Sequence, residues 1–568
     1  MATPATVLGL TPRQRHLSRW QMLKNERNSW LEHWRDLSDH VNPRRARFLS
    51  TDRNRSTRNT TIINSTPTSA AKILTSGMMA AISSPARPWF RLTTPDPTLA
   101  EQGEVREWLH QVEELVREAL ARSNLYDCLR EVYDSLAIYG VAALHVEQDD
   151  QDILRGFVFP VGQYALATSA TQRIDTVYRE LSMTTRQLFQ MFGRDKCSNS
   201  VHTAYDAGNL DQWFEVLHVI TPNEDYEQGK LGPKGKAWAS CWMEMKADNS
   251  AGYLRESGYE EMPVICPRWE VTGEDVYGWC PAMHALGDCK ELQHLEKRYA
   301  QAVDKVVNPP MLAPSTMMTR RISLLPGDTT PVDGITGHQK VEPAMVIAPQ
   351  ALSAVETKIA KVERRINSAF LADLWLLQTQ ADGKMTATEV AARQEEKMLQ
   401  LGPVLHRFQN EGLNPLFDRV FALLHRLGLI PEPPEVLDGM NLRVEYLSIV
   451  ETAQRVLGAA SVERFAAFVG SLITMSPESI DKVDVDEVID GYAAALSIPP
   501  DMVRADENVA KLRAARDQRL QAQQQGEAMM AATQGAKNLA GASMEGDNGL
   551  TRIAQQMGIE PGVPTGQA

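Results

Sequence analysis

The sequence predicts an α+β fold, with helices and antiparallel strands in the first half and a mainly helical second half. Between residues 141 and 269, short apolar runs are separated by polar turns, which is typical of strands. On either side, apolar residues recur at steps of three and four, which is typical of amphipathic helices. A chain of 568 residues exceeds the size of a single growing core, so we expect several domains.

The composition is that of a globular protein. Hydrophobic residues make up 43% of the chain and the mean hydropathy is -0.31, so a large core can form. No run approaches the roughly 18 apolar residues of a membrane span, and residues 1–10 lack the pattern of a secretory signal. We therefore expect synthesis in the cytosol and no membrane partner.

The net charge and the cysteine spacing argue against two classes of protein: those that bind nucleic acid over their whole surface and those built around a structural metal. The formal net charge of -13 argues against a surface that grips nucleic acid phosphates throughout, although it permits a protein past which DNA slides. The six cysteines show no C-x-x-C pair and no histidines at zinc spacing. We expect reduced, mostly buried thiols and no structural metal.

The chain begins with a predicted helix whose apolar stripe includes Trp20, Trp30 and Trp34 and which ends at Pro43. Three tryptophans at helical spacing are usually core, although they can also stack on bases. The six arginines within residues 44–58 form either an arm that touches nucleic acid or an acidic partner, or a solvated loop.

The next helices and strands are predicted from changes in the spacing of apolar residues. Helices are expected over residues 62–79, 101–139 and 184–192, the last ended by Gly193. Strands are expected over residues 141–146, 153–159, 176–181, 213–220, 238–245 and 262–269.

The second half is organised around long helices. A helix over 283–307 stops at Asn308, Pro309 and Pro310, and residues 311–350 are rich in proline, glycine and threonine. Apolar spacing from Leu352 to Leu374 predicts a second helix.

A polar break over residues 378–384 separates this helix from a third one that reaches residue 427. Thr386 and Glu389 form a predicted capping box at its start, and Gly402 with Pro403 predicts a bend. Beyond it we expect a strand over 442–446, helices within 451–475, 485–497 and 505–531, and little fixed structure from residue 535.

A search for catalytic motifs finds none. Gly235 with Lys236, and Gly383 with Lys384, lack the remaining residues of a phosphate-binding loop. The acidic residues between 481 and 490 lack the spacing of a calcium loop, so a solvated helix start is the simpler interpretation. His218 and His294 lie in apolar periodic segments, which favours core or interface histidines. The sequence therefore predicts an architectural or binding protein without catalytic residues, cofactor or metal.

Several motifs, taken in order, resemble the portal proteins, or head-to-tail connectors, of short-tailed bacteriophages. The blocks that carry this resemblance are Trp30 with Pro43, residues 63–67, Gly77, Ser84 and Pro85 with Trp89 and Phe90, Tyr277 and Gly278 with Pro281, residues 308–310, residues 385–390 with Arg393 and Glu396, and residues 401–403 with Glu411 and Pro415. The resemblance runs roughly from Trp20 to Tyr446, and the block at 385–415 is its most specific part.

The resemblance implies a portal-type fold with an α/β wing, paired stem helices, a small clip subdomain, a long kinked helix and a helical crown. The implied parts are an N-terminal wing (1–282), stem helix 1 (283–307), a clip (308–350), stem helix 2 (351–377), a tunnel loop (378–385), the remaining wing with the long kinked helix (386–450), a crown (451–505) and a C-terminal helix, barrel or tail (506–568).

The resemblance also implies a non-enzymatic ring, typically a dodecamer, which assembles in the host cytoplasm and lies at one capsid vertex of the virion. Its channel would pass double-stranded DNA during packaging and ejection. Implied partners are the major capsid and scaffolding proteins, the terminase large subunit and a tail adaptor protein. The residues implied to face DNA are those of the tunnel loop, with Lys384 nearest: Gln378, Thr379, Gln380, Asp382, Gly383 and Lys384. The alternatives are a metal-dependent packaging nuclease or terminase-like enzyme, and a generic oligomeric scaffold.

Overall fold

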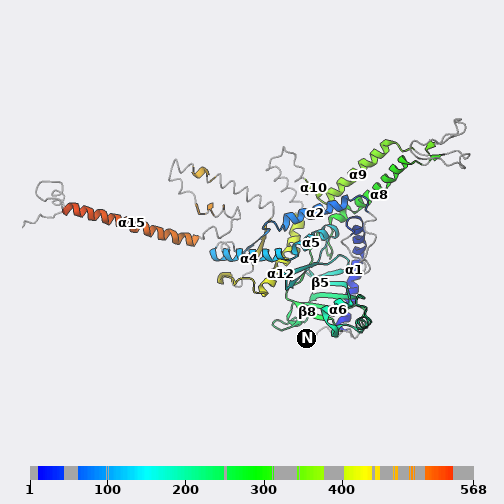
Figure 1. The fold of residues 1–568 in the computed structure, drawn as a ribbon, viewed down its shortest axis with the longest axis horizontal. Helices are drawn as coiled ribbons and strands as arrows, with labels where there is room; N and C mark the ends of the chain where they lie inside the picture. Colours follow the sequence, from blue (N-terminus) through cyan, green and yellow to red (C-terminus); the bar gives the residue numbers. More distant parts are fainter. Residues whose placement is uncertain are drawn as a thin grey trace, which may run out of the picture. The chain divides into compact units, whose positions relative to one another are not determined.

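The structure is a computed structural model (Figure 1). It describes residues 11–43, 62–96, 99, 102–247, 252–309, 311–312, 342–343, 346–376, 402–437, 442–447, 465, 467–470, 485–486, 488–489, 492 and 506–540. The chain forms two compact units: the first spans Met1–Pro97 and Trp108–Gly458, and the second spans Thr98–Glu107 and Ala459–Ala568. Among the described helices, none combines the length and apolarity needed to cross a membrane.

The described residues contain helices and antiparallel sheets, which confirms the predicted α+β class. The helices are α1 (Pro12–His40), α2 (Thr66–Ile82), α4 (Gly103–Arg122), α5 (Leu125–Tyr139), α6 (Thr185–Phe192), α7 (Asn199–Asp206), α8 (Pro281–Val307), α9 (Pro349–Ala369), α10 (Ala372–Leu376), α12 (Asn414–Arg426) and α15 (Asp506–Ala540). The strands are β1 (Phe90–Thr93), β2 (Leu144–Asp149), β3 (Ile153–Val158), β4 (Tyr164–Thr168), β5 (Ile174–Thr184), β6 (Trp213–Pro222), β7 (Trp238–Glu244), β8 (Arg255–Tyr259), β9 (Val264–Ile265), β10 (Met311–Leu312), β11 (Glu342–Pro343) and β12 (Arg443–Tyr446).

A five-stranded antiparallel sheet in the order β4-β5-β6-β7-β8 forms the centre of the first unit, beside a three-stranded sheet in the order β3-β2-β9. Helix α1 runs along one face of the larger sheet (Figure 1). Trp20 and Leu23 of this helix pack on that face. Helices α6 and α7 cover the other face through Leu188 and Val201. Because alternate strand residues point to opposite faces, Val216 joins the second cluster and Leu217 the first.

Helix α1 is fixed at its start and along its length. The Thr11 hydroxyl accepts a hydrogen bond from the Gln14 backbone amide, and the Gln14 side-chain oxygen accepts one from the Thr11 backbone amide. These two bonds form a capping box around Pro12, the first residue of the helix. Two buried arginines then tie the helix to backbone carbonyls of the sheet. Arg13 donates to the Glu244 oxygen and Arg27 to the Tyr164 oxygen. Helix α1 is therefore held to the sheet by polar bonds as well as by apolar packing.

Most of the side chains expected in the core are buried. Trp20 and Trp34 are 2% and 0% exposed, and Trp30 is half-buried against Trp34 and Tyr277. His218 is buried, shares a hydrogen bond with Ser240 and stacks on Trp242. His294, by contrast, is exposed on α8, so it is not a core residue, and its place in an interface stays a prediction. All six cysteines are free and all except the half-exposed Cys197 are buried.

Several predicted boundaries are wrong. Residues 101–139 form two helices, because Ser123 and Asn124 interrupt them and Asn124 binds both backbone groups of Gly156 instead. Strands β4 and β8 were not predicted, and the strand expected at 262–269 shortens to β9. The second long helix ends at Ala369, because Leu371 adopts a left-handed backbone with φ of 54°. Helix α15 continues to Ala540, beyond the predicted onset of unstructured chain.

Strands β1 and β12 bring distant parts of the first unit together over a buried carboxyl group. Glu113 of α4 accepts a hydrogen bond of 2.6 Å from the Leu92 amide. Burial is the main cause that raises the pKa of Glu113 from 4.5 to about 7. Because the native state holds this proton more tightly than the unfolded state does, the resulting stability is complete below about pH 4.5 and is lost as the pH rises through about 7.

We expect Glu113→Gln to remove this pH dependence. A glutamine amide oxygen can still accept the Leu92 hydrogen bond, but it carries no charge to desolvate. The variant should match the wild type at about pH 4.5 and exceed its free energy of unfolding by about 2–3 kcal/mol at about pH 8. Urea unfolding across this pH range is the measurement. An equal difference at both pH values would contradict the assignment.

Candidate functional site

Helices α8 and α9 form an antiparallel hairpin that extends away from the sheets of the first unit (Figure 1). At the base of the hairpin, Leu292, Val362 and Ile366 are fully buried. Toward the far end the apolar residues become accessible, and Val306 and Val307 are 46% and 79% exposed. The hairpin is therefore anchored at one end only, and its outer part has apolar surface available to a neighbour.

A single polar loop ties both helices of the hairpin at the base. The Asn64 side-chain amide donates to Glu296 of α8 at 2.7 Å and to Glu363 of α9 at 2.9 Å. The side-chain oxygen of Gln293 accepts from the backbone amides of Ile63 and Asn64. This loop is part of the block at residues 63–67 that carried the family resemblance, and its contacts give the physical reason for those residue types.

Ion pairs join the two helices on another side of the hairpin. Glu291 of α8 pairs with Lys358 at 2.9 Å and with Arg365 at 2.7 Å, and Arg365 also pairs with Asp288. The hydrogen bond from Lys358 is the main cause that lowers the pKa of Glu291. Because the two cations are about half exposed and the two carboxylates are about one-third exposed, solvent weakens these pairs, and they fix the register of the helices more than they stabilise them.

The chain that leaves α9 is held against α2. A Cβ atom at Gly77 would overlap the indole ring of Trp375, so glycine is the residue that lets α10 approach α2 this closely. This contact explains why Gly77 belongs to the resemblance pattern. The residues implied to face DNA, 378–385, lie outside the described residues, as do most of the implied clip and crown. Among the described residues, Trp375 against Gly77 anchors the chain just before them.

The helix that follows these residues contains a π-helical turn at Gln409–Leu413 between Gly402 and the end of α12. The sequence placed the irregularity at Gly402 and Pro403 only, whose preceding residues lie outside the described part, so this turn was not predicted. A π-turn inserts one extra residue into the helix and rotates the following side chains. Here it presents Glu411 to the neighbouring β-rich part of the unit.

Glu411 forms the most buried ion pair near this helix. The guanidinium of Arg268, whose side chain is 4% exposed, donates to both carboxylate oxygens of Glu411 at 3.1 and 2.8 Å. The same guanidinium donates to the carbonyl oxygens of Gln172 and Asp275. Glu411 belongs to the family pattern found in the sequence, but the sequence analysis did not identify Arg268 as its partner.

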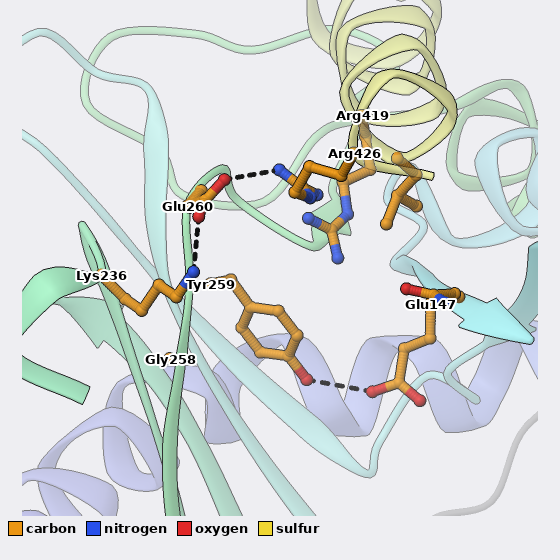
Figure 2. Close-up of a pocket in the computed structure, with 9 residues that line it drawn as sticks. Glu147, Lys236, Gly258, Tyr259, Glu260, Arg419 and Arg426 are labelled. Atoms are coloured by element: carbon orange, nitrogen blue, oxygen red, sulfur yellow. Dashed lines mark hydrogen bonds and ion pairs between the residues drawn. The ribbon is translucent and has the colours of Figure 1, made fainter. Parts of the chain in front are cut away.

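A polar cavity of about 300 Å³ lies between the five-stranded sheet, β2 and α12 (Figure 2). The Tyr259 hydroxyl donates to Glu147 at 3.0 Å across one side of it. Next to Glu147, His145 is buried, and burial is the main cause that lowers its pKa to about 3. The lining residues are Glu147, Gln148, Lys236, Gly258, Tyr259, Glu260, Arg419, Leu423 and Arg426.

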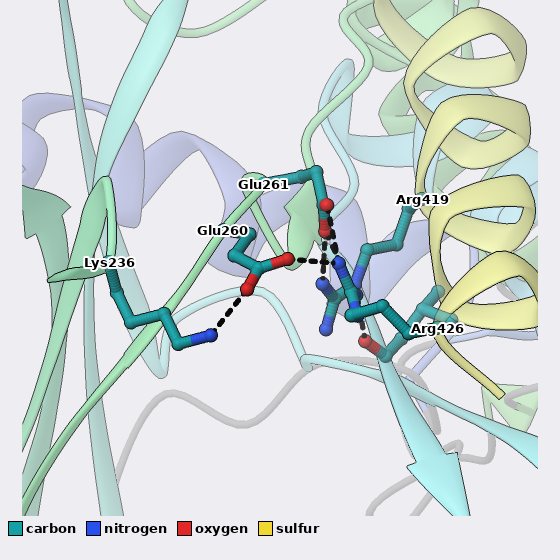
Figure 3. Close-up of polar contacts among 6 residues, drawn as sticks. Lys236, Glu260, Glu261, Arg419 and Arg426 are labelled. Atoms are coloured by element: carbon teal, nitrogen blue, oxygen red, sulfur yellow. Dashed lines mark hydrogen bonds and ion pairs between the residues drawn. The ribbon is translucent and has the colours of Figure 1, made fainter. Parts of the chain in front are cut away.

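The charges around this cavity form one connected network (Figure 3). Arg426 bonds to both Glu260 and Glu261, and Arg419 bonds to Glu261 at 2.8 Å. Lys236 completes the network on Glu260 and is the main cause that lowers the pKa of that carboxyl group. Arg419 and Arg426 belong to α12, and their partners Glu260 and Glu261 directly follow β8. The network therefore joins α12 to the edge of the sheet. Lys236, tested in the sequence as part of a phosphate loop, has this structural role.

The described residues contain no group of three histidine, cysteine, aspartate or glutamate side chains able to hold a metal ion. Of the acidic run at 481–490, Asp486 is described, and it forms a two-point ion pair with Arg513 at 2.6 and 2.8 Å. That hydrogen bonding lowers the pKa of Asp486. The arrangement at Asp486 is that of a paired surface carboxylate.

Comparisons with known proteins identify the family of this chain. The family described as bacteriophage head to tail connecting protein matches residues 13–503. The portal protein of Salmonella phage epsilon15 is 44% identical over 551 residues, which cover 96% of this chain and 99% of that protein. The probable portal protein of Bordetella phage BPP-1 is 39% identical over 547 residues, covering 96% and 98%.

A solved structure of the neck of an empty GTA particle, determined with C6 symmetry, covers 70% of this chain and 86% of its own. Its sequence identity is 13% and its TM-score is 0.33, too low to define a common fold. The match at residues 13–503 and the two relatives, which are covered almost over their full length, confirm the resemblance found in the sequence. This chain belongs to the family of bacteriophage head to tail connecting proteins, the portal proteins.

Proposed function

We propose that this chain assembles into a closed ring at one vertex of a phage capsid. The ring's channel passes double-stranded DNA during packaging and ejection, without sequence specificity. The observation that carries this proposal is the α8–α9 hairpin, which is anchored at its base and leaves apolar residues exposed beyond it. Such a flank is buried when the same hairpin of a neighbouring subunit packs against it and the rotation closes.

In this proposal the parts of the chain have the roles that the resemblance implies. Helices α8 and α9 are the stem, residues 308–350 the clip and residues 378–385 the tunnel loop. The sheets and the helix with the π-turn belong to the wing, residues 451–505 to the crown, and α15 to an internal barrel or tail. The ring is a dodecamer and resides in the virion after assembly in the host cytoplasm.

The proposed partners act at different parts of the ring. The terminase large subunit and a tail adaptor protein dock on it in turn, while major capsid and scaffolding proteins surround the wing. Terminase supplies the hydrolysis of ATP, and the portal itself is a non-enzymatic conduit. A predominantly acidic chain suits this role, because fixed rings of cations would hold DNA in the channel. Among the described residues no observation favours a packaging nuclease.

Electron microscopy of the purified chain tests the ring. Closed rings with an axial hole support the proposal. Monomers that cleave DNA when a divalent metal is added would favour the nuclease instead.

Deleting residues 378–384 tests the tunnel loop. The rings should still form, because Trp375 still packs on Gly77 and Phe408 on Tyr133, while packaging or retention of DNA should fall. Electron microscopy and the DNA content of particles are the two measurements. A matched control removes the seven exposed residues 225–231 from a surface loop and should change neither. Normal packaging by the tunnel-loop deletion would show that the loop assignment is wrong.

A further inference from the structure

The α8–α9 hairpin has two broad faces that differ in charge. On α8, Glu296 contacts the Asn64 loop and Glu291 contacts Lys358 and Arg365. Positions that are five residues apart point about 140° apart on an α-helix, so these two contacts mark opposite faces. On α9 the same spacing separates Glu363, which contacts Asn64, from Lys358, which contacts Glu291. In both helices, therefore, one face is turned toward Asn64 and the opposite face carries the ion pairs between α8 and α9.

The face toward Asn64 carries carboxylates, and we call it the acidic face. Its charged residues are Glu296, Glu356 and Glu363. Glu296 and Glu363 accept hydrogen bonds from the neutral Asn64 amide. Glu356, two turns before Glu363 and exposed, accepts one from the Tyr299 hydroxyl, which is the main cause that raises the pKa of Tyr299. Within the described part of the chain, no lysine or arginine pairs with these three carboxylates.

The opposite face carries an excess of cations, and we call it the basic face. Glu291 and Asp288 are its carboxylates, and both are already paired across the hairpin. Helical spacing from Glu291 and from Lys358 places three further exposed cations on this face, and none has a carboxylate partner among the described residues. The cations of the basic face are Arg298, Lys305, Lys358, Lys361 and Arg365.

We infer that the basic face of one subunit's hairpin docks against the acidic face of the next copy of this chain. The inference rests on the ring proposed above and adds which surfaces meet. In a cyclic ring every interface joins two different patches of the same chain, so a hairpin with oppositely charged faces is complementary to its own neighbour. Such pairing fixes the direction in which subunits follow one another and opposes a reversed contact, which would bring like charges together.

Charge reversal on each face tests this docking. The first variant, Arg298→Glu with Lys361→Glu, makes both faces acidic. The second, Glu296→Lys with Glu356→Lys, makes both faces basic. Each variant alone should need a roughly tenfold or more higher protein concentration to assemble. An equimolar mixture should form rings again, because the two kinds of subunit can alternate. Native mass spectrometry of the mixture, with one variant isotope-labelled, reports both ring formation and alternation.

A matched control makes the same charge change away from both faces. Lys297 and Arg364 are exposed on the outer edges of α8 and α9, each five positions after a buried core residue, Leu292 and Ile359. Lys297→Glu with Arg364→Glu should assemble like the wild type. Circular dichroism of every variant, as monomer at low concentration, verifies that the hairpin is folded before assembly is scored.

Three results would overturn the inference, and each has a different meaning. If both reversed variants form rings as readily as the wild type, the two faces do not meet. If the first variant assembles normally but loses affinity for a duplex DNA probe, the basic face contacts DNA instead of a neighbour. If the wild type forms no rings under the same conditions, the proposed ring itself fails, and this inference fails with it.

Discussion

Glu411→Ala is expected to lower the free energy of unfolding of the first unit by about 3–5 kcal/mol. The substitution leaves the Arg268 guanidinium, 4% exposed, without its carboxylate, and it also removes the acceptor of the Arg268 backbone amide. An unpaired buried charge costs far more than the pair contributes, which explains the size of the effect. Urea unfolding followed by tryptophan fluorescence measures it.

An exposed ion pair provides the control for this prediction. Arg194 and Asp206 pair at 2.8 Å, but their side chains are 56% and 63% exposed. Asp206→Ala should therefore cost less than about 1 kcal/mol. Replacing both buried partners, with Arg268→Met and Glu411→Leu, should cost less than Glu411→Ala alone, because no charge is then stranded. Equal losses for the buried and the exposed carboxylates would show that burial does not make the Arg268–Glu411 pair costly to break.

Gly140→Ala is expected to cost at least about 3 kcal/mol, because two penalties add. Gly140 ends α5 in a left-handed conformation with φ of 76°, which costs an alanine roughly 1–2 kcal/mol. In addition, its Cβ would overlap the backbone carbonyl oxygen of Gly278, and no side chain can move aside to relieve this contact. Since Gly278 lies just before α8, the substitution should also displace the start of that helix.

Gly208 separates the two contributions. It has a φ of 77°, and a Cβ atom added to it would meet no other atom within 4 Å, so Gly208→Ala carries only the conformational cost. The difference between the two variants in thermal or urea unfolding then measures the close approach of Gly140 to Gly278. If both glycines respond equally, the backbone contact does not determine where α8 begins.

The sequence by itself determined the class of fold, the family and the approximate position of most long elements. Those predictions depend on properties that lie along the chain: the three-to-four spacing of α1 and α8, the short apolar runs of β3 and β6 between polar turns, and the prolines that follow Asn308. Local stereochemistry imposes these signals, so they can be read before any tertiary contact forms. Gly77 and Asn64 stood out as family residues, but nothing along the chain explained why those residue types are needed there.

Only the tertiary structure decided what those residues do, because their roles depend on groups distant in sequence. Gly77 leaves room for the indole ring of Trp375, and Asn64 joins Glu296 to Glu363. The π-turn lies where Glu411 pairs with Arg268. The break at Leu371 was likewise invisible, since its residues continue an apolar helical spacing. At these points packing and charge pairing between remote segments decide the local structure, because intrinsic helix propensity is worth less than about 1 kcal/mol per residue.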